Sequence, residues 1–187
     1  DFARGRVSMT DDSAFEVGRN VATTPGSVVF ENDLIQLIQY APTTAKVHER
    51  PLLIVPPCIN KYYILDLQPD NSLVAHAVAQ GHTVFLVSWR NAGPEQGNLG
   101  WDDYLEQGVM QAIDVALAIS GADRANTLGF CIGGTLLASA LAVLAARGED
   151  KAASLTLLTT MLDFSNTGEL GLMVSEQAVA AREASIG

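Results

Sequence analysis

Short apolar runs and longer helical periods alternate along most of this chain. Four continuous apolar or β-branched runs of strand length occupy residues 51–55, 83–89, 124–130 and 154–161. The segments between them, at 73–80, 101–119 and 135–147, space their apolar residues as helices do. Strands that are apolar throughout are typical of a parallel sheet with both faces covered. The pattern predicts an α/β fold with a mostly parallel sheet and helices on both faces.

The segment 101–119 gives the clearest helical pattern. Its apolar residues recur at three- and four-residue steps, Asp102 and Asp103 suit the positive N-terminal end, and Gly121 is placed to end it. We therefore expect one continuous helix there.

The chain before residue 51 follows a different pattern. Residues 27–30 and 34–40 favour β-structure and are joined through Glu31-Asn32-Asp33, which predicts an antiparallel hairpin at the edge of the sheet. Residues 1–26 are polar, and Asp11-Asp12-Ser13 could cap a short helix through Val17. We interpret residues 1–26 as the end of an N-terminal region or linker.

Composition narrows the class of protein. The chain has 187 residues, 48% of them hydrophobic, which is enough for one domain with a real core. A net charge of −10 without a basic cluster argues against nucleic-acid binding. Its longest apolar run, 136–146, is too short to cross a bilayer, and we expect no membrane span. Two cysteines without zinc-ligand spacing predict neither a disulfide framework nor a metal site, and a reducing compartment is expected.

The stretch Gly129-Phe130-Cys131-Ile132-Gly133-Gly134 carries the candidate chemistry. It lies between a predicted strand and a predicted helix, and Gly129 and Gly133 flank the cysteine as glycines flank serine in the nucleophile elbow G-x-S-x-G. A thiolate at a helix N-terminus is stabilised by the helix dipole, so Cys131 is the candidate nucleophile. The alternative interpretation is a small buried hydrophobic residue at a tight turn.

Two backbone amides are candidates for an oxyanion hole. The Ile132 amide directly follows the nucleophile and would face the oxygen of an attacked carbonyl. The loop after the first parallel strand, 56–61, should supply the second donor, for which we choose the Ile59 amide. Cys58 in that loop is a possible second thiol near the site, with a buried, inert cysteine as the more favoured interpretation.

A general base for the thiol is not evident. His48, His76 and His82 all precede Cys131, whereas in α/β-hydrolase order the acid and then the histidine follow the nucleophile. We interpret His82 as a turn residue, His76 as a half-buried structural residue, and Asp163 as an acid at a strand end or turn.

These stretches closely resemble the class I polyhydroxyalkanoate synthases. The resemblance runs from about residue 11 to about residue 176 and is strongest in PLLIVPPCINKYYILDL at 51–67, GHTVFLVSWRN at 81–91 and the GFCIGG stretch. It also includes WDDY at 101–104 and LLTTMLDF at 157–164. Within this resemblance, 27–165 would be the N-terminal part of an α/β-hydrolase catalytic domain and 166–187 the start of a cap region.

The resemblance implies an acyltransferase that polymerises (R)-3-hydroxyacyl-CoA, typically 3-hydroxybutyryl-CoA, into a polyester. Cys131 matches the family's catalytic cysteine, which takes the acyl group from coenzyme A. The resemblance further implies a homodimer in the cytoplasm at the surface of polyester granules, and no metal or redox cofactor. Because the family's Asp and His lie further downstream, we expect an internal fragment that is inactive alone and has an exposed strand edge.

Two other functions stay open at this stage. A cysteine-dependent hydrolase of the same fold would release the acyl group to water, and fold alone does not separate it from a polymerase. A non-catalytic granule-binding or interface protein would use the glycine-rich stretch only as a tight turn.

Overall fold

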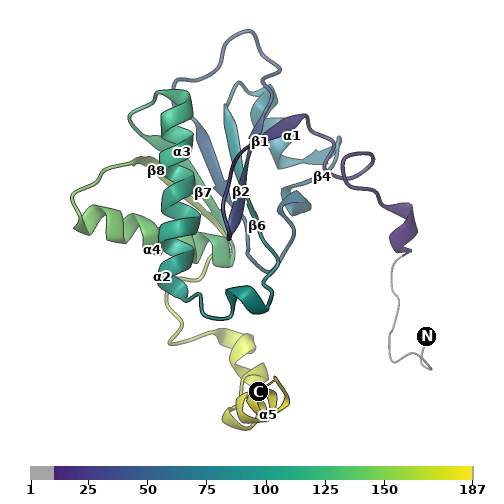
Figure 1. The fold of residues 1–187 in the computed structure, drawn as a ribbon, viewed down its shortest axis with the longest axis vertical. Coiled ribbons are helices and arrows are strands. Elements are labelled where there is room, and N and C mark those ends of the chain that lie inside the picture. The colour runs from purple at the N-terminus through teal and green to yellow at the C-terminus, as the bar shows by residue number, and fades with distance from the viewer. Residues whose placement is uncertain (1–10, 187) are drawn as a thin grey trace.

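A six-stranded sheet forms the centre of the molecule (Figure 1). The computed structural model describes residues 11–186, so the first ten residues of the expected N-terminal region lie outside it. The strands are arranged in the order β1-β2-β6-β3-β7-β8. The central strands are β3 (Leu52–Val55), β6 (Val84–Trp89) and β7 (Ala125–Phe130), with β8 (Ala152–Leu158) at one edge. The pairs β3–β6, β3–β7 and β7–β8 are all parallel. The expected mostly parallel sheet is therefore confirmed.

The opposite edge is the expected antiparallel hairpin. Strand β1 (Gly26–Glu31) pairs with β2 (Ile35–Tyr40), which in turn runs antiparallel to β6. Asn32 shapes the turn between them, because its Oδ1 accepts the amides of Leu34 and Ile35, each at 2.9 Å. A short second sheet pairs β4 (Asp66–Gln68) with β5 (Asn71–Ser72).

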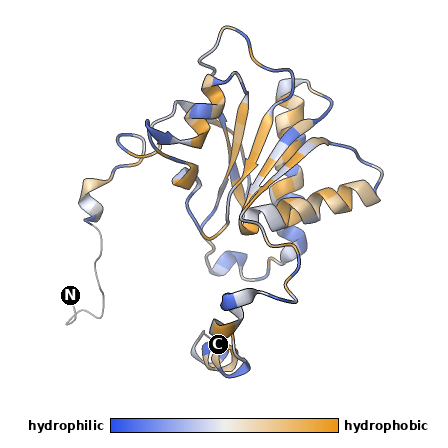
Figure 2. Ribbon diagram, turned by 180° about the vertical axis from the view of Figure 1, so that it is seen from behind, coloured by the Kyte–Doolittle hydropathy of each residue, from blue (hydrophilic) through white to orange (hydrophobic). Residues whose placement is uncertain are grey.

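Helices cover both faces of the sheet. Helices α3 (Gln111–Ser120) and α4 (Ile132–Ala146) pack on one face around a core that includes Phe85 and Leu137. Helix α1 (Leu73–Ala79) packs on the other face against Ile54 and Leu86. Apolar residues accordingly follow the strands, while polar residues occupy many connecting loops (Figure 2). The alternating faces of β3 and β6 thus supply two cores, as the continuous apolar runs predicted.

The expected helix over 101–119 is interrupted. It consists of α2 (Trp101–Asp103), a π-helical segment (Tyr104–Met110) and α3, which ends at Ser120 before Gly121 at φ +69°. Gly108 in the π-helical segment lies against the indole of Trp89, and a Cβ added there would lie 2.7 Å from two ring atoms. The widened turn lets the backbone pack closely on this ring, which an apolar periodicity alone does not reveal.

Strand β8 differs from the expectation for a strand covered on both faces. Leu155 and Leu158 are 43% and 37% exposed, because β8 is an edge strand with α4 near only one side. The strand also ends at Leu158, three residues earlier than predicted, since Thr159 has φ +46° and breaks the extended conformation. The expected exposed strand edge is present in this chain.

The C-terminal segment lies away from the sheet. A 3₁₀ segment (Gly168–Met173) leads into α5 (Glu176–Ile186), which Figure 1 shows beyond the end of the sheet. Residues 176–185 of α5 are all exposed. Across residues 11–186, no helix is both long enough and apolar enough to span a membrane.

Buried Asp66 joins the N-terminal segment to the α/β core. Its Oδ1 accepts the hydroxyls of Thr24 and Ser72, both at 2.6 Å, and its carbonyl accepts the Ala22 amide at 2.9 Å. Ser72 also caps α1, because its Oγ accepts the Ala75 amide. Between residues 11 and 23 the helical structure is limited to a short 3₁₀ turn (Asp12–Ala14), so the predicted helix through Val17 is wrong. Asp11 Oδ1 instead accepts the amide and hydroxyl of Ser13.

We expect Asp66→Ala to lower the free energy of unfolding by about 2–4 kcal/mol, because two hydroxyls lose their acceptor beside a new cavity. Urea titration measures the change. Asp70→Ala is the matched control, since this exposed acid lies four residues away and its loss should cost less than about 0.5 kcal/mol. Equal stability of the two variants would show that Asp66 does not anchor this region.

Candidate active site

Cys131 lies at a sharp corner between β7 and α4. Strand β7 ends at Phe130 and α4 begins at Ile132, so the helix starts three residues earlier than predicted. Cys131 has φ 55° and ψ −129°, a conformation that costs a non-glycine residue about 1–3 kcal/mol. Its side chain is exposed. A strained backbone that presents an exposed thiol at a helix N-terminus has the geometry of a nucleophile elbow.

The three predicted elbow glycines lie where no larger residue fits. A Cβ on Gly129 would overlap the α-carbon of Gly134, and a Cβ on Gly133 would overlap the carbonyl oxygens of Val55 and Pro56. A Cβ on Gly134 would overlap Oγ1 of Thr160. The first turn of α4 therefore packs directly against backbone from β3 and against the segment that follows β8.

The loop after β3 lies beside the corner. Gly133 packs on the Pro56 carbonyl, and that carbonyl accepts the indole N–H of Trp89 at 2.9 Å. Ile59 lies in the following turn with an 80% exposed side chain. The Ile132 amide is the first of α4 and has no acceptor within the helix. Both amides chosen as oxyanion donors thus belong to segments that meet at the carboxyl ends of β3 and β7.

Cys58 is a half-buried neighbour of this corner. Burial raises the pKa of its thiol, its own backbone hydrogen bond opposes the rise, and the nearby Cys131 adds a smaller increase. At neutral pH Cys58 is therefore held as the thiol, the poorly nucleophilic form. This environment agrees with the interpretation of Cys58 as an inert residue near the site.

The three histidines lie away from the corner. The rings of His48 and His82 lie 4.7 Å apart at a tilt of 47°, beside Gly81, whose carbonyl accepts the His48 amide. This pair precedes β6 and so lies at the amino ends of the parallel strands, whereas Cys131 follows the carboxyl end of β7. His76 is exposed on α1, so its interpretation as a half-buried structural residue is wrong: the buried side of this short helix is formed by Val74, Ala77 and Val78. Among residues 11–186, no histidine is therefore placed to take a proton from Cys131.

Two further expectations concern acids and metals. Asp163 follows β8 as a turn acid: its Oδ1 accepts the Ser165 amide at 2.9 Å, and this bond lowers the pKa of the carboxyl group. Within the described part of the chain, no three His, Cys, Asp or Glu side chains are grouped to hold a metal ion.

Sequence reasoning missed the threonines around the corner. Thr135 Oγ1 donates to the Met161 carbonyl at 2.8 Å, and Thr160 lies over Gly134. The β-branched Thr159-Thr160 pair predicts a continuing strand, and only the left-handed backbone of Thr159 shows that the chain turns there. The indole bond from Trp89 to Pro56 was equally hidden, since it joins residues 33 positions apart.

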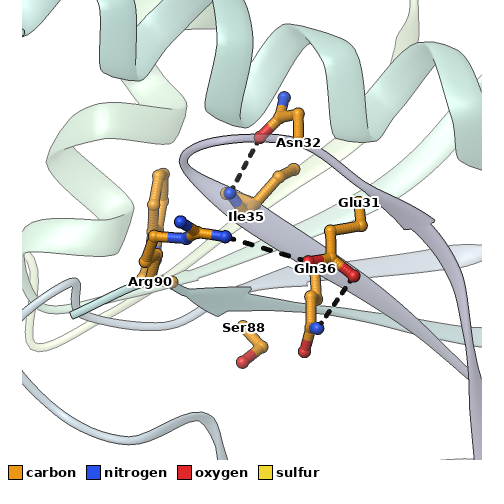
Figure 3. Close-up of a pocket in the computed structure, with 7 residues that line it drawn as sticks. Glu31, Asn32, Ile35, Gln36, Ser88 and Arg90 are labelled. Carbon is orange, nitrogen blue, oxygen red and sulfur yellow. Dashed lines mark hydrogen bonds and ion pairs between the residues drawn. The ribbon is translucent and has the colours of Figure 1, made fainter. Parts of the chain in front are cut away.

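A separate pocket of about 190 Å³ opens near the carboxyl end of β6 (Figure 3). Arg90 Nη2 lies 3.9 Å from Glu31 Oε1, and Gln36 Nε2 donates to the other carboxylate oxygen at 3.1 Å. The lining of this pocket therefore carries one acidic side chain, Glu31, and one basic side chain, Arg90. This arrangement does not favour an anionic ligand in the pocket.

Fold and corner together define a member of the α/β-hydrolase class. The family model described as "alpha/beta hydrolase fold" matches residues 51–178. Among solved structures, a putative esterase from Staphylococcus aureus aligns with a TM-score of 0.61 at 15% identity, covering 96% of this chain and 59% of that one. A putative lipase from Sulfolobus solfataricus gives a TM-score of 0.57 at 15% identity, covering 72% and 43%. Identities this low show the fold alone.

Sequence relatives narrow the class further. The model for the N-terminus of poly-beta-hydroxybutyrate polymerase (PhaC) matches residues 1–77. The poly(3-hydroxyalkanoate) polymerase subunit PhaC of Cupriavidus necator is 64% identical over the whole chain, which spans 32% of that protein. The poly(3-hydroxyalkanoate) polymerase of Methylorubrum extorquens is 48% identical over 95% of the chain, which spans 29% of it. The chain belongs to the poly(3-hydroxyalkanoate) polymerase (PhaC) family, and it spans about a third of the length of these relatives.

Proposed function

We propose that this chain carries the nucleophile of a class I polyhydroxyalkanoate synthase. The exposed Cys131, strained at a glycine-lined corner in a chain 64% identical to a named polymerase subunit, is the observation that carries the proposal. The substrate is an (R)-3-hydroxyacyl-CoA, in particular 3-hydroxybutyryl-CoA.

The first step is acyl transfer to sulfur. The Cys131 thiolate attacks the thioester carbonyl, a bond forms between Sγ and the acyl carbon, and the coenzyme A thiolate leaves and takes up a proton. The amides of Ile132 and Ile59 donate to the oxygen that becomes negative in the tetrahedral intermediate. This acyl transfer needs no metal ion and no redox cofactor, and neither does the chain extension that follows it.

The second step extends the polyester. The hydroxyl of one hydroxyacyl unit attacks the thioester of another, which forms an ester bond and releases a thiol. A histidine held by an acid would take the hydroxyl proton. Because His48 and His82 lie at the amino ends of the parallel strands and His76 is exposed on α1, we propose that this pair comes from outside this chain.

The cellular setting follows from the same proposal. A growing polyester on Cys131 would keep the enzyme at the surface of a polyester granule, and we further propose that the enzyme is cytoplasmic and acts as a homodimer. The 187 residues alone should lack polymerase activity, since no histidine within residues 11–186 is placed to act as a base for the thiol.

Product analysis tests the function. The longer protein containing this chain, given (R)-3-hydroxybutyryl-CoA, should release coenzyme A and form high-mass polyester. Free 3-hydroxybutyrate as the main product would instead indicate a hydrolase. Residues 1–187 alone should release coenzyme A no faster than the uncatalysed reaction, and measurable turnover by them would contradict the proposed need for an external base.

A further inference from the structure

The chain reverses over the nucleophile corner directly after β8. Leu158 ends the strand, and Thr159 then takes a left-handed conformation with φ +46°. This value is unusual for a β-branched residue and is sustained only where neighbouring contacts fix it. The reversal brings Thr160 and Met161 onto the first turn of α4. We call residues 159–161 the threonine turn.

Thr160 fills the space above the elbow glycine. A Cβ on Gly134 would overlap Thr160 Oγ1 and lie 2.8 Å from its Cγ2, so the threonine side chain rests on the glycine backbone. The same hydroxyl donates to the Leu158 carbonyl at 3.1 Å. That carbonyl also accepts the amide of Cys131 at 2.9 Å. One carbonyl at the end of β8 therefore joins the nucleophile's own backbone to Thr160.

Thr135 makes the second attachment. It lies one turn into α4, is only 8% exposed, and donates its hydroxyl to the Met161 carbonyl at 2.8 Å. The amides of Thr135 and Gly134 both donate to the Cys131 carbonyl. Thr135 thus holds the threonine turn with its side chain and the backbone of Cys131 with its amide.

We propose that Thr135 and Thr160 are positioning residues for Cys131, which hold the first turn of α4 against the end of β8. The proposal deepens the proposed function and rests on it for the role of Cys131. Neither threonine needs to touch substrate. Their effect passes through the backbone of Cys131 and through the Ile132 amide that begins the same helical turn.

Small displacements at this corner should matter chemically. The thiolate gains from the amide dipoles of the first turn, and an oxyanion donor works only when it lies near the position of the developing charge. Loosening this turn would separate both groups from their productive positions, and misplacement by about 1 Å can cost about 10²-fold in rate.

Thr135→Val in the longer protein tests the first attachment. It keeps the shape of the side chain and removes one hydroxyl, so we expect kcat to fall about 3- to 10-fold with KM little changed. Alkylation of Cys131 by iodoacetamide, followed on its peptide by mass spectrometry, should slow by a similar factor. Thr135→Ser keeps the hydroxyl and should restore most of both rates.

Thr127→Val is the matched control. Thr127 is 1% exposed and donates its hydroxyl to the Ser154 carbonyl at 2.8 Å, a bond of the same kind and length as that of Thr135, but within the sheet between β7 and β8 and four residues before the nucleophile. We expect this variant to lower Tm as much as Thr135→Val does while kcat and Cys131 alkylation stay at their wild-type values. Equal kinetic effects of the two variants would overturn the proposal.

Thr160→Ala and Thr160→Ser test the second attachment. The alanine variant should slow turnover and alkylation, and the serine variant should recover most of both, because it keeps the hydroxyl. Should Thr135→Val fail to fold, this pair decides the question alone. Wild-type alkylation and turnover in Thr160→Ala would overturn the positioning role. A polymerase that keeps its turnover after Cys131→Ala would instead refute the proposed function, so the two failures are distinguishable.

Discussion

Cys131→Ala is expected to reduce coenzyme A release from (R)-3-hydroxybutyryl-CoA by at least about 10³-fold in the longer protein, because no other atom can hold the acyl group in its place. The rate of coenzyme A release measures the effect. The fold should remain intact, because the side chain of Cys131 is exposed and the alanine variant keeps all of the backbone contacts at this corner.

Cys58→Ala is the matched control for that substitution. Cys58 is the chain's other cysteine, it lies close to Cys131, and burial keeps it as the thiol. We expect its replacement to leave turnover within about tenfold of the wild-type value, the loss coming from a small cavity rather than lost chemistry. An equal loss in both variants, or full activity without Cys131, would contradict the assignment of the nucleophile.

Gly133→Ala should be the most damaging change of a single methyl group. Its Cβ would overlap two backbone carbonyl oxygens, those of Val55 and Pro56, and neither can move without shifting β3 or breaking the bond from Trp89. We expect the free energy of unfolding to fall by about 2–4 kcal/mol. Turnover should fall by more than about 10²-fold, because any shift displaces the first turn of α4.

Gly100→Ala provides the comparison for that variant. A Cβ on Gly100 meets no atom within 4 Å, and its φ of −102° suits alanine. As the residue before α2 it should cost less than about 1 kcal/mol. Urea titration and the coenzyme A assay report on both variants. A Gly133→Ala protein as stable and active as Gly100→Ala would show that the corner is not tightly packed.

The centre of the sheet was predictable because β3 and β6 are buried on both faces. Residues 52–55 and 84–89 read as continuous apolar runs, and their burial follows from central positions in the sheet. The corner was predictable from its glycines. Gly129 and Gly133 lie where backbone approaches backbone too closely for any side chain, and such a requirement is visible in the sequence as conspicuous glycines.

Features that depend on contacts between distant residues were not predictable. The π-helical segment occurs where Gly108 contacts Trp89, a residue 19 positions earlier in the chain. The apolar periodicity within the helix does not depend on that contact and so cannot predict it. The exposure of β8 depends on its position at the edge of the sheet, which apolar composition does not encode. The threonine turn was mistaken for strand because Thr159 and Thr160 are β-branched and favour extended backbone.

Capture of the covalent intermediate tests the role of Cys131 most directly. The longer protein would be mixed briefly with (R)-3-hydroxybutyryl-CoA, quenched in acid to preserve thioesters, digested and examined by mass spectrometry. We predict a 3-hydroxybutyryl group, or a short oligomer of it, on the peptide that contains Cys131 and none on the peptide that contains Cys58. An acyl group on any other residue, or continued coenzyme A release with Cys131 unmodified, would contradict the account.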